Sequence, residues 1–150
     1  MRAIIQRVSS ASVAIHGAIH ARIGHGLLVL VAVEDRDTTE DAGWLAGKIF
    51  RLRVFDDAAG IMNLCVADVQ GDLLIVSQFT LYASTKKGNR PSYARSSRPE
   101  IAIPLYEDFV AQSAALLGRP VATGVFGAQM MVSLVNEGPV TIPMDSRAKE

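Results

Sequence analysis

Polar side chains follow the most apolar stretch in the middle of the chain. The residues from Leu73 to Val76 are all aliphatic, and they are followed directly by Ser77, Gln78, Phe79 and Thr80. An unpaired buried hydroxyl or amide costs roughly 1–3 kcal/mol, so these groups must bond to one another or serve a ligand. Thr80 could act as a nucleophile only beside a base, and this segment contains no His, Lys or carboxylate. A strand that ends in a polar turn would give the same pattern.

A second interruption lies near the C-terminus, where Asn136, Gly138 and Pro139 break an apolar strand pattern. Gly138 would leave room for a ligand to approach the backbone, and Pro139 would fix φ and hold the neighbouring carbonyl groups rigidly. A plain turn is the alternative. The residue types alone do not indicate a cis peptide bond, which is uncommon even before proline.

A basic segment without any acidic residue extends from Lys86 to Pro99. It holds a third of the positive side chains, namely Lys86, Lys87, Arg90, Arg95 and Arg98. Gly, Pro and Ser residues predict a loop, and a loop this basic in a neutral protein is suited to phosphate contacts, with Tyr93 available to stack on a base. Solvated surface is the alternative interpretation.

The sequence gives little support for a metal site or a catalytic triad. The spacing of His16, His20 and His25 fits no metal site, so neither a metal nor a cofactor is predicted. A Ser/His/Asp triad could be drawn through Ser77, but the Gly-x-Ser-x-Gly turn is absent.

The elements that must position these residues follow from hydrophobic periodicity. Strands are expected over 3–8, 11–15 and 18–23, over the continuous aliphatic run 27–33, and over 54–55 and 73–79. Three more are expected over 121–126, 130–135 and 140–142. Helices are expected over 38–51, with Asp37 and Glu40 as its start signal, and over 104–117. The pattern predicts an α+β fold with a curved, mostly antiparallel, barrel-like sheet and two main helices.

The length and composition of the chain predict one domain over residues 1–150. Hydrophobic residues make up 49% of the chain, enough for a substantial core, and 15 basic residues balance 15 acidic ones. Any nucleic acid or anionic membrane would therefore have to be held by a local patch. The single Cys65, together with the lack of a leader or membrane span, predicts a cytoplasmic protein.

Taken together, several of these motifs resemble the D-aminoacyl-tRNA deacylase family. They are the start Met1 to Val8, the segment Ser77 to Leu81, Lys87 to Ser92, Phe126 to Ala128, and Asn136 to Thr141. The resemblance covers residues 1 to about 146. It implies hydrolysis of the ester that joins a D-amino acid, or misloaded glycine, to the terminal adenosine of tRNA. It also implies a homodimer in which a cis Gly138–Pro139 bond reaches into the partner's pocket.

The resemblance assigns roles to residues on this basis. Catalysis falls to Ser77, Gln78, Phe79 and Thr80; substrate binding and chirality selection to Asn136, Gly138 and Pro139; and tRNA binding to Lys86, Lys87, Arg90 and Arg95. A backbone wall near Cα would exclude an L side chain and admit glycine, and backbone N–H groups near Phe79 and Thr80 would stabilise the oxyanion. Thr80 is expected to position the substrate, assisted by the ribose 2′-hydroxyl. A module that binds RNA without cleaving it and a small-molecule esterase are the alternatives.

Overall fold

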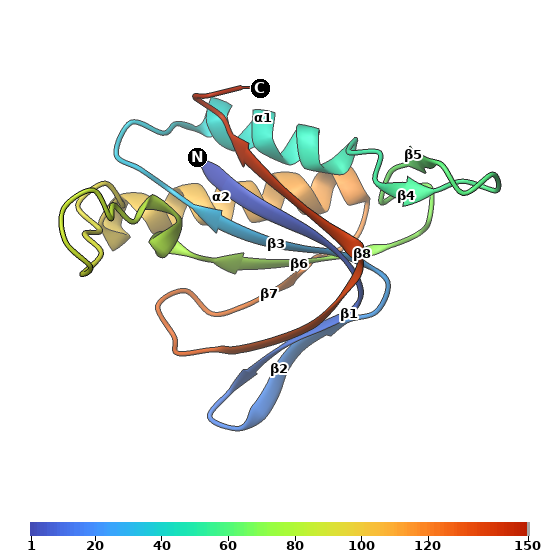
Figure 1. Cartoon of the computed structure of the whole chain (residues 1–150), viewed down its shortest axis with the longest axis horizontal. Helices are drawn as coiled ribbons and strands as arrows, with labels where there is room; N and C mark the ends of the chain where they lie inside the picture. Colours follow the sequence, from blue (N-terminus) through green and yellow to red (C-terminus); the bar gives the residue numbers. More distant parts are fainter. Residues whose placement is uncertain (150) are drawn as a thin grey trace.

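The structure, a computed structural model, describes residues 1–149 and consists of one curved sheet with two helices packed on it (Figure 1). The sheet contains β1 (Arg2–Ile15), β2 (Ala18–Ile23), β3 (Gly26–Ala32), β6 (Asp72–Ser77), β7 (Ala122–Thr123) and β8 (Met131–Asp145). A separate hairpin is formed by β4 (Phe55–Asp56) and β5 (Met62–Leu64).

Strand β1 organises the sheet because three other strands pair with it. Its first half pairs with β3, its second half pairs with β2, and β8 runs antiparallel along nearly all of its opposite edge. The sheet continues from β3 through β6 to β7 in parallel pairings, and β2 curves back to contact β6 and β7. The predicted α+β class, with a curved, mainly antiparallel and barrel-like sheet, is confirmed. The parallel pairings were not predicted, because they depend on long helical crossovers that local sequence does not reveal.

Helices α1 (Thr39–Phe50) and α2 (Pro99–Leu117) lie side by side on one face of the sheet (Figure 1). The second helix begins earlier than predicted, because Pro99 rather than Pro104 occupies its first turn. Pro104 lies inside the helix and cannot donate a backbone hydrogen bond. Ala102 of the first turn is buried in the core, so packing against the core stabilises this turn.

The start of α1 also differs from the prediction. The Asp41 carboxylate accepts hydrogen bonds from the Thr38 backbone N–H at 2.9 Å and from the Thr38 hydroxyl at 3.1 Å. Asp37, which was expected to cap the helix, is fully buried and accepts a hydrogen bond of 2.6 Å from the Met1 ammonium group. A buried charge requires a partner of opposite sign, and Asp37 therefore pairs with the Met1 ammonium group instead of capping the helix.

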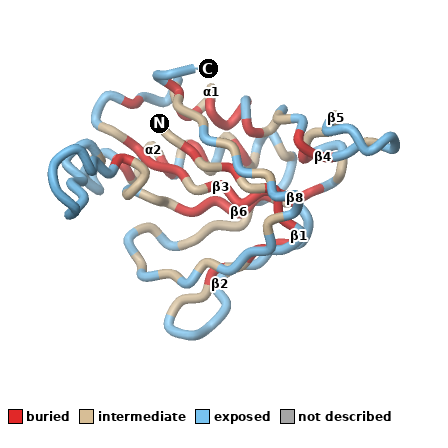
Figure 2. The backbone as a smooth tube through the Cα atoms, in the orientation of Figure 1, coloured by how far each residue is buried: buried red, intermediate tan, exposed pale blue. Residues whose placement is uncertain are grey.

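Buried residues are concentrated on β3, β6 and α1 (Figure 2), and apolar cores lie on both faces of the sheet. The larger core joins Leu27 and Val29 of β3 to Leu45 of α1 and Phe109 of α2. The smaller core, on the concave side, contains Val8, Val13, Leu28, Leu74 and Val76. Because neighbouring side chains of a strand point to opposite faces, β3 is buried on both sides, as its aliphatic sequence predicted.

The C-terminal strands are the least well predicted elements. The expected segments 130–135 and 140–142 are parts of one strand, β8, and the expected strand 121–126 shrinks to the two residues of β7. The polar residues between the two segments lie in an excursion from the ladder, not at the end of a strand. This excursion places Gly138 and Pro139 on the outside of the sheet.

Candidate active site

A cavity of about 270 Å³ opens beside the ends of β3 and β6. Its walls come from Val31 and Val33 at the end of β3, from Ser77 to Phe79 at the end of β6, from Tyr106 of α2, and from the segment Phe126 to Ala128. The lining is largely apolar, with Ser77 and Gln78 at the end of β6 and Ser97 among its few polar residues. This arrangement is typical of a site that holds a ring system and orients it with a few hydrogen bonds.

The polar segment after β6 is fixed by its backbone. The Gln78 backbone N–H donates to the Val31 carbonyl at 2.7 Å, which extends the ladder by one bond beyond the strand. A short 3-10 helix, η1 (Phe79–Tyr82), then begins, and the first N–H groups of such a helix have no acceptor within it. Phe79 lines the cavity, whereas Thr80 does not, and the N–H groups of both residues could bind an anionic oxygen.

The hydroxyl of Thr80 lies next to an amide, not next to a base. Its Oγ1 accepts a hydrogen bond of 2.5 Å from Nε2 of Gln78. Among residues 1–149 no histidine, lysine or carboxylate hydrogen-bonds to this hydroxyl. Gln78 therefore orients Thr80 without increasing its nucleophilicity.

Aromatic side chains form the inner wall of the cavity. The Tyr106 hydroxyl donates to the Ile75 carbonyl at 3.1 Å, and its ring meets that of Phe126 at a centroid separation of 5.8 Å. Burial raises the pKa of Tyr106 to about 12, so its hydroxyl remains a neutral donor. Tyr106 thus ties α2 to β6 and offers an aromatic surface to the cavity.

Behind the cavity, the Tyr82 ring holds η1 in place. It is fully buried, with the guanidinium groups of Arg2 and Arg95 at 4.6 and 5.4 Å from its centroid. Burial, followed by the nearby carboxylates of Asp37 and Glu34, raises the pKa of Tyr82 above its usual value. The ring therefore acts as a neutral anchor between two cations.

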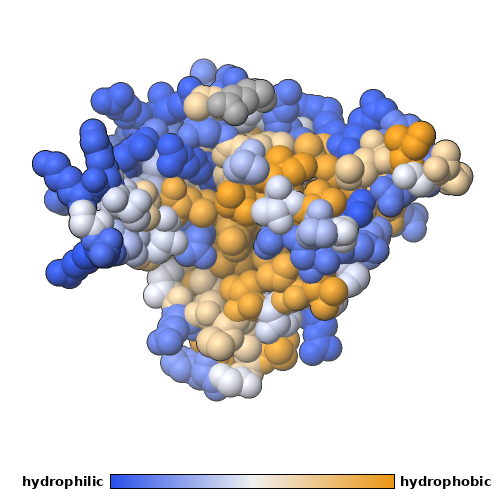
Figure 3. Space-filling view, viewed as in Figure 1, coloured by the Kyte–Doolittle hydropathy of each residue, from blue (hydrophilic) through white to orange (hydrophobic). Residues whose placement is uncertain are grey.

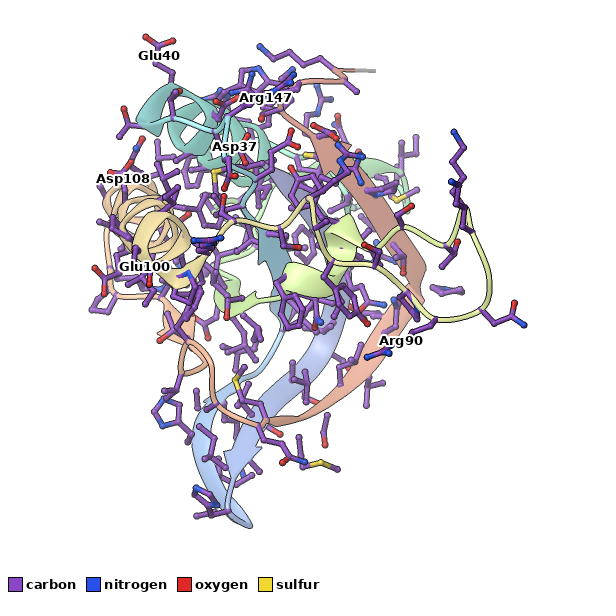
Figure 4. The ribbon with its side chains drawn as sticks, turned by 90° about the vertical axis from the view of Figure 1, so that its left-hand side faces the viewer. Asp37, Glu40, Arg90, Glu100, Asp108 and Arg147 are labelled. Atoms are coloured by element: carbon purple, nitrogen blue, oxygen red, sulfur yellow. The ribbon has the colours of Figure 1, made fainter. Side chains whose placement is uncertain are left out.

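The basic loop is joined to the same segment. Backbone hydrogen bonds of 2.8 and 2.9 Å between Ser84 and Ser92 close it, and the Ser96 hydroxyl donates to the Phe79 carbonyl at 2.7 Å. Figure 4 shows the loop that carries Arg90 extending away from the body of the molecule. Arg95 lies nearer the base of the loop, where it pairs with Glu34 at 3.3 Å.

The excursion from β8 forms a projecting tip, defined as residues 137–140. Gln6 pairs with Thr141 and Val8 pairs with Asn136, so the tip lies opposite the single residue Arg7 of β1. The Gly138–Pro139 peptide bond is cis, as the resemblance implied. Gly138 has φ +142°, a value that favours glycine, and a Cβ there would lie 2.9 Å from the Val140 backbone nitrogen.

Arg7 holds the tip from behind, and sequence reasoning missed this role. Its Nε donates to the Glu137 carbonyl at 2.8 Å, and one terminal nitrogen reaches the Val54 carbonyl at 2.6 Å and Asp56 at 3.3 Å. The side chain is almost completely buried. A charged residue between the apolar residues Ile5 and Val8 of β1 was the signal that could have revealed it.

Asn136 closes the tip from the other end. Its Oδ1 accepts from the Val140 N–H at 2.8 Å, and its Nδ2 donates to the Val140 carbonyl at 3.2 Å and to the Thr141 hydroxyl at 3.0 Å. The side-chain amide is therefore used within the tip. Ser77 to Phe79 line the cavity, whereas Gly138 and Pro139 do not line the cavity of their own chain.

The chain is similar in sequence to known proteins. Residues 4–145 match the family model described as "D-Tyr-tRNA(Tyr) deacylase". The chain belongs to this deacylase family. A relative from Porphyromonas gingivalis, named D-aminoacyl-tRNA deacylase, is 60% identical over 150 residues, which are the whole of both chains.

Two solved structures share the fold of this chain. The structure titled "c-Myc DNA Unwinding Element Binding Protein" superposes with a TM-score of 0.91 at 38% identity, covering 97% of this chain and 98% of that one. A probable eukaryotic D-amino acid tRNA deacylase gives a TM-score of 0.81 at 20% identity, covering 95% and 97% of the two chains, which supports the fold alone.

Within residues 1–149 there is no group of three or more His, Cys, Asp or Glu side chains that could hold a metal ion. No helix in that range is long and apolar enough to cross a membrane.

Proposed function

We propose that this protein hydrolyses the ester between a D-amino acid and the terminal adenosine of tRNA, releasing the free amino acid and tRNA. The observation that carries the proposal is the cavity at the end of β6, in a chain that matches the deacylase family over residues 4–145. A cytoplasmic location fits this substrate, since aminoacyl-tRNA is made and used there.

The cavity suits the adenosine end of the substrate. Tyr106 and Phe126 offer aromatic surface to the adenine, and Ser77 and Gln78 stand at the mouth with their side chains partly exposed. This places the ester near the start of η1. Water attacks the carbonyl carbon, the bond to the ribose oxygen breaks, and that oxygen leaves with a proton.

The N–H groups of Phe79 and Thr80 stabilise the oxyanion that forms during this attack. An ester needs less activation than an amide, so positioning and oxyanion stabilisation are sufficient without a protein nucleophile. Thr80 acts in positioning, because its hydroxyl is bonded to Gln78 and not to a base. The neighbouring ribose 2′-hydroxyl, which the substrate itself carries, assists proton transfer.

Selection against L-amino acids falls to Gly138 and Pro139 of a second subunit. Both residues are exposed, both are held from behind by Arg7 and Asn136, and neither lines the cavity of its own chain. A wall of backbone placed against Cα would clash with an L side chain but not with a D side chain. Glycine, which has no side chain, would pass this wall, so glycyl-tRNA is a second substrate.

The homodimer that this requires is supported by strand β8. Within residues 1–149 this strand pairs only with β1, which leaves its other edge open. Large apolar side chains of β8 are exposed, with Met131 at 70% and Val135 at 58%, and Ile19 of β2 is 53% exposed. Figure 3 shows apolar residues gathered over the face that carries β8 and β1. An open edge and an apolar face of this kind are typical of an interface between subunits.

The basic loop provides the electrostatic contact with tRNA. Lys86, Lys87 and Arg90 are exposed, and none of them belongs to a salt bridge within residues 1–149. The Arg95 guanidinium group forms an ion pair with Glu34, so it contributes less to phosphate binding.

Incubation with D-tyrosyl-tRNA and L-tyrosyl-tRNA tests the proposal. Release of D-tyrosine well above the uncatalysed rate, with L-tyrosyl-tRNA left intact, is the expected result. Binding of tRNA without release of D-tyrosine would support a binding module instead. Turnover of simple esters, unaffected by removal of the tRNA body, would support a small-molecule esterase.

A further inference from the structure

An exposed aromatic pair stands at the mouth of the cavity, on the side of the basic loop. The rings of Phe79 and Tyr93 meet edge to face with a centroid separation of 5.1 Å. Phe79 is 56% exposed and Tyr93 is 40% exposed. Two large aromatic side chains exposed together are unusual on a surface unless they serve a partner.

The pair bridges two parts of the proposed binding site. Phe79 lines the cavity, and Tyr93 lies in the basic loop, which carries Lys86, Lys87 and Arg90. The Ser96 hydroxyl, which donates to the Phe79 carbonyl, fixes this end of the loop against η1. The aromatic surface therefore lies between the proposed adenosine pocket and the cations proposed to meet phosphate.

We propose that Phe79 and Tyr93 form a stacking platform for the base of the nucleotide that precedes the terminal adenosine of the substrate. This inference rests on the proposed function, because it requires the terminal adenosine to occupy the cavity. A single-stranded end that enters a cavity with its last base presents the face of its preceding base at the mouth. Stacking of such bases on aromatic side chains beside a basic groove is a common mode of binding single-stranded nucleic acid.

The test uses a short RNA hairpin that carries a D-amino acid through a stable amide linkage. A fluorescent cytosine analogue replaces the base before the terminal adenosine. Stacking on a ring quenches the analogue, so quenching is expected with the wild-type protein and with Tyr93→Phe, and much less with Tyr93→Leu. Binding with no quenching in the wild-type protein would overturn the inference.

A second arm measures hydrolysis of the ester-linked hairpin, with and without the base before the adenosine. Tyr93→Leu is expected to lower kcat/KM at least about fivefold more on the intact hairpin than on the abasic one, since one stacked base contributes at least that much. An equal loss on both hairpins would mean that Tyr93 only positions Phe79, which would also overturn the inference. Quenching without any hydrolysis would instead reject the proposed reaction and leave the platform standing.

Discussion

The segment Ser77–Thr80 and the tip 137–140 both interrupt apolar strands, yet they are held in opposite ways. The first lies in the wall of the cavity and is hydrogen-bonded to its neighbours Val31, Ala83 and Ser96. The tip projects from the sheet and is held from behind by Arg7 and Asn136, and the Glu137 carboxylate lies 3.1 Å from Nε2 of His25. The first region thus offers groups to a ligand that enters it, and the second offers a rigid shape to something outside its own chain.

Because the tip acts through its shape, we expect changes in that shape to reduce activity the most. Gly138→Ala places a Cβ 2.9 Å from the Val140 nitrogen and 3.2 Å from Arg7, at a φ of +142°. We expect a loss of about 100-fold in kcat/KM on D-tyrosyl-tRNA, because a small displacement of a positioning group has an effect of that size.

Gly60→Ala is the matched control for this change. Gly60 also has a positive φ, +75°, but a Cβ there meets nothing within 4 Å. It should lower stability slightly and leave kcat/KM unchanged. Equal losses of activity in the two variants would show that the tip has no special role.

Loss of the support behind the tip should have the next largest effect. Arg7→Lys removes the forked contact with the Glu137 and Val54 carbonyls, and we expect a loss of roughly tenfold in kcat/KM together with lower stability. Arg119→Lys is the control, because Arg119 also binds backbone carbonyls, those of Gln70 and Gly71, away from the tip. A similar fall in kcat/KM for both variants would attribute the effect to stability alone.

Removal of positive charge from the loop should weaken binding of tRNA rather than its hydrolysis. Replacing Lys87 and Arg90 together by alanine should reduce the slope of log K against log salt by about 1.4, if each meets one phosphate of a single strand. Arg95→Ala should change the slope less, since Arg95 pairs with Glu34 and lies over Tyr82. An unchanged slope in the double variant would show that the loop does not contact phosphate.

Side-chain changes in the segment Ser77–Thr80 should reduce activity less than changes in the tip. Thr80→Ala removes the acceptor of the Gln78 amide but leaves the backbone N–H groups, so we expect activity to fall by less than about tenfold. Thr80→Ser, which keeps the hydroxyl, should be close to wild type. A loss of several thousandfold in Thr80→Ala with tRNA binding intact would identify Thr80 as the nucleophile.

Outside both regions, Asp41 should affect stability but not activity. Burial disfavours its charged form, but hydrogen bonds from Ser146 and Thr38 outweigh this and lower its pKa from 3.8 to about 2. Because the folded pKa is the lower one, its contribution is complete above about pH 5 and is lost as the pH falls toward 2. Asp41→Asn should therefore reduce the loss of Tm between pH 5 and pH 2, and identical pH profiles would contradict this.

Periodicity predicted most of the fold, because the long aliphatic segments of β3 and β6 and the amphipathic faces of both helices are local signals. The polar segment after β6 was recognisable for the same reason. The continuity of β8 through its tip was not, since it depends on pairing with β1 across the whole chain. Arg7 was missed because its partners Val54 and Glu137 are distant in sequence, and nothing local to β1 predicts them.

Mixing of two inactive variants tests most directly whether the tip of one subunit completes the pocket of the other. Gly138→Ala disables the tip, and Ala128→Trp fills the cavity that Ala128 lines. After the two variants are unfolded and refolded together, half of the dimers are mixed, and each should contain one intact site. The account predicts recovery of about a quarter of the wild-type rate on D-tyrosyl-tRNA. No recovery, with mixed dimers demonstrated by mass, would contradict it.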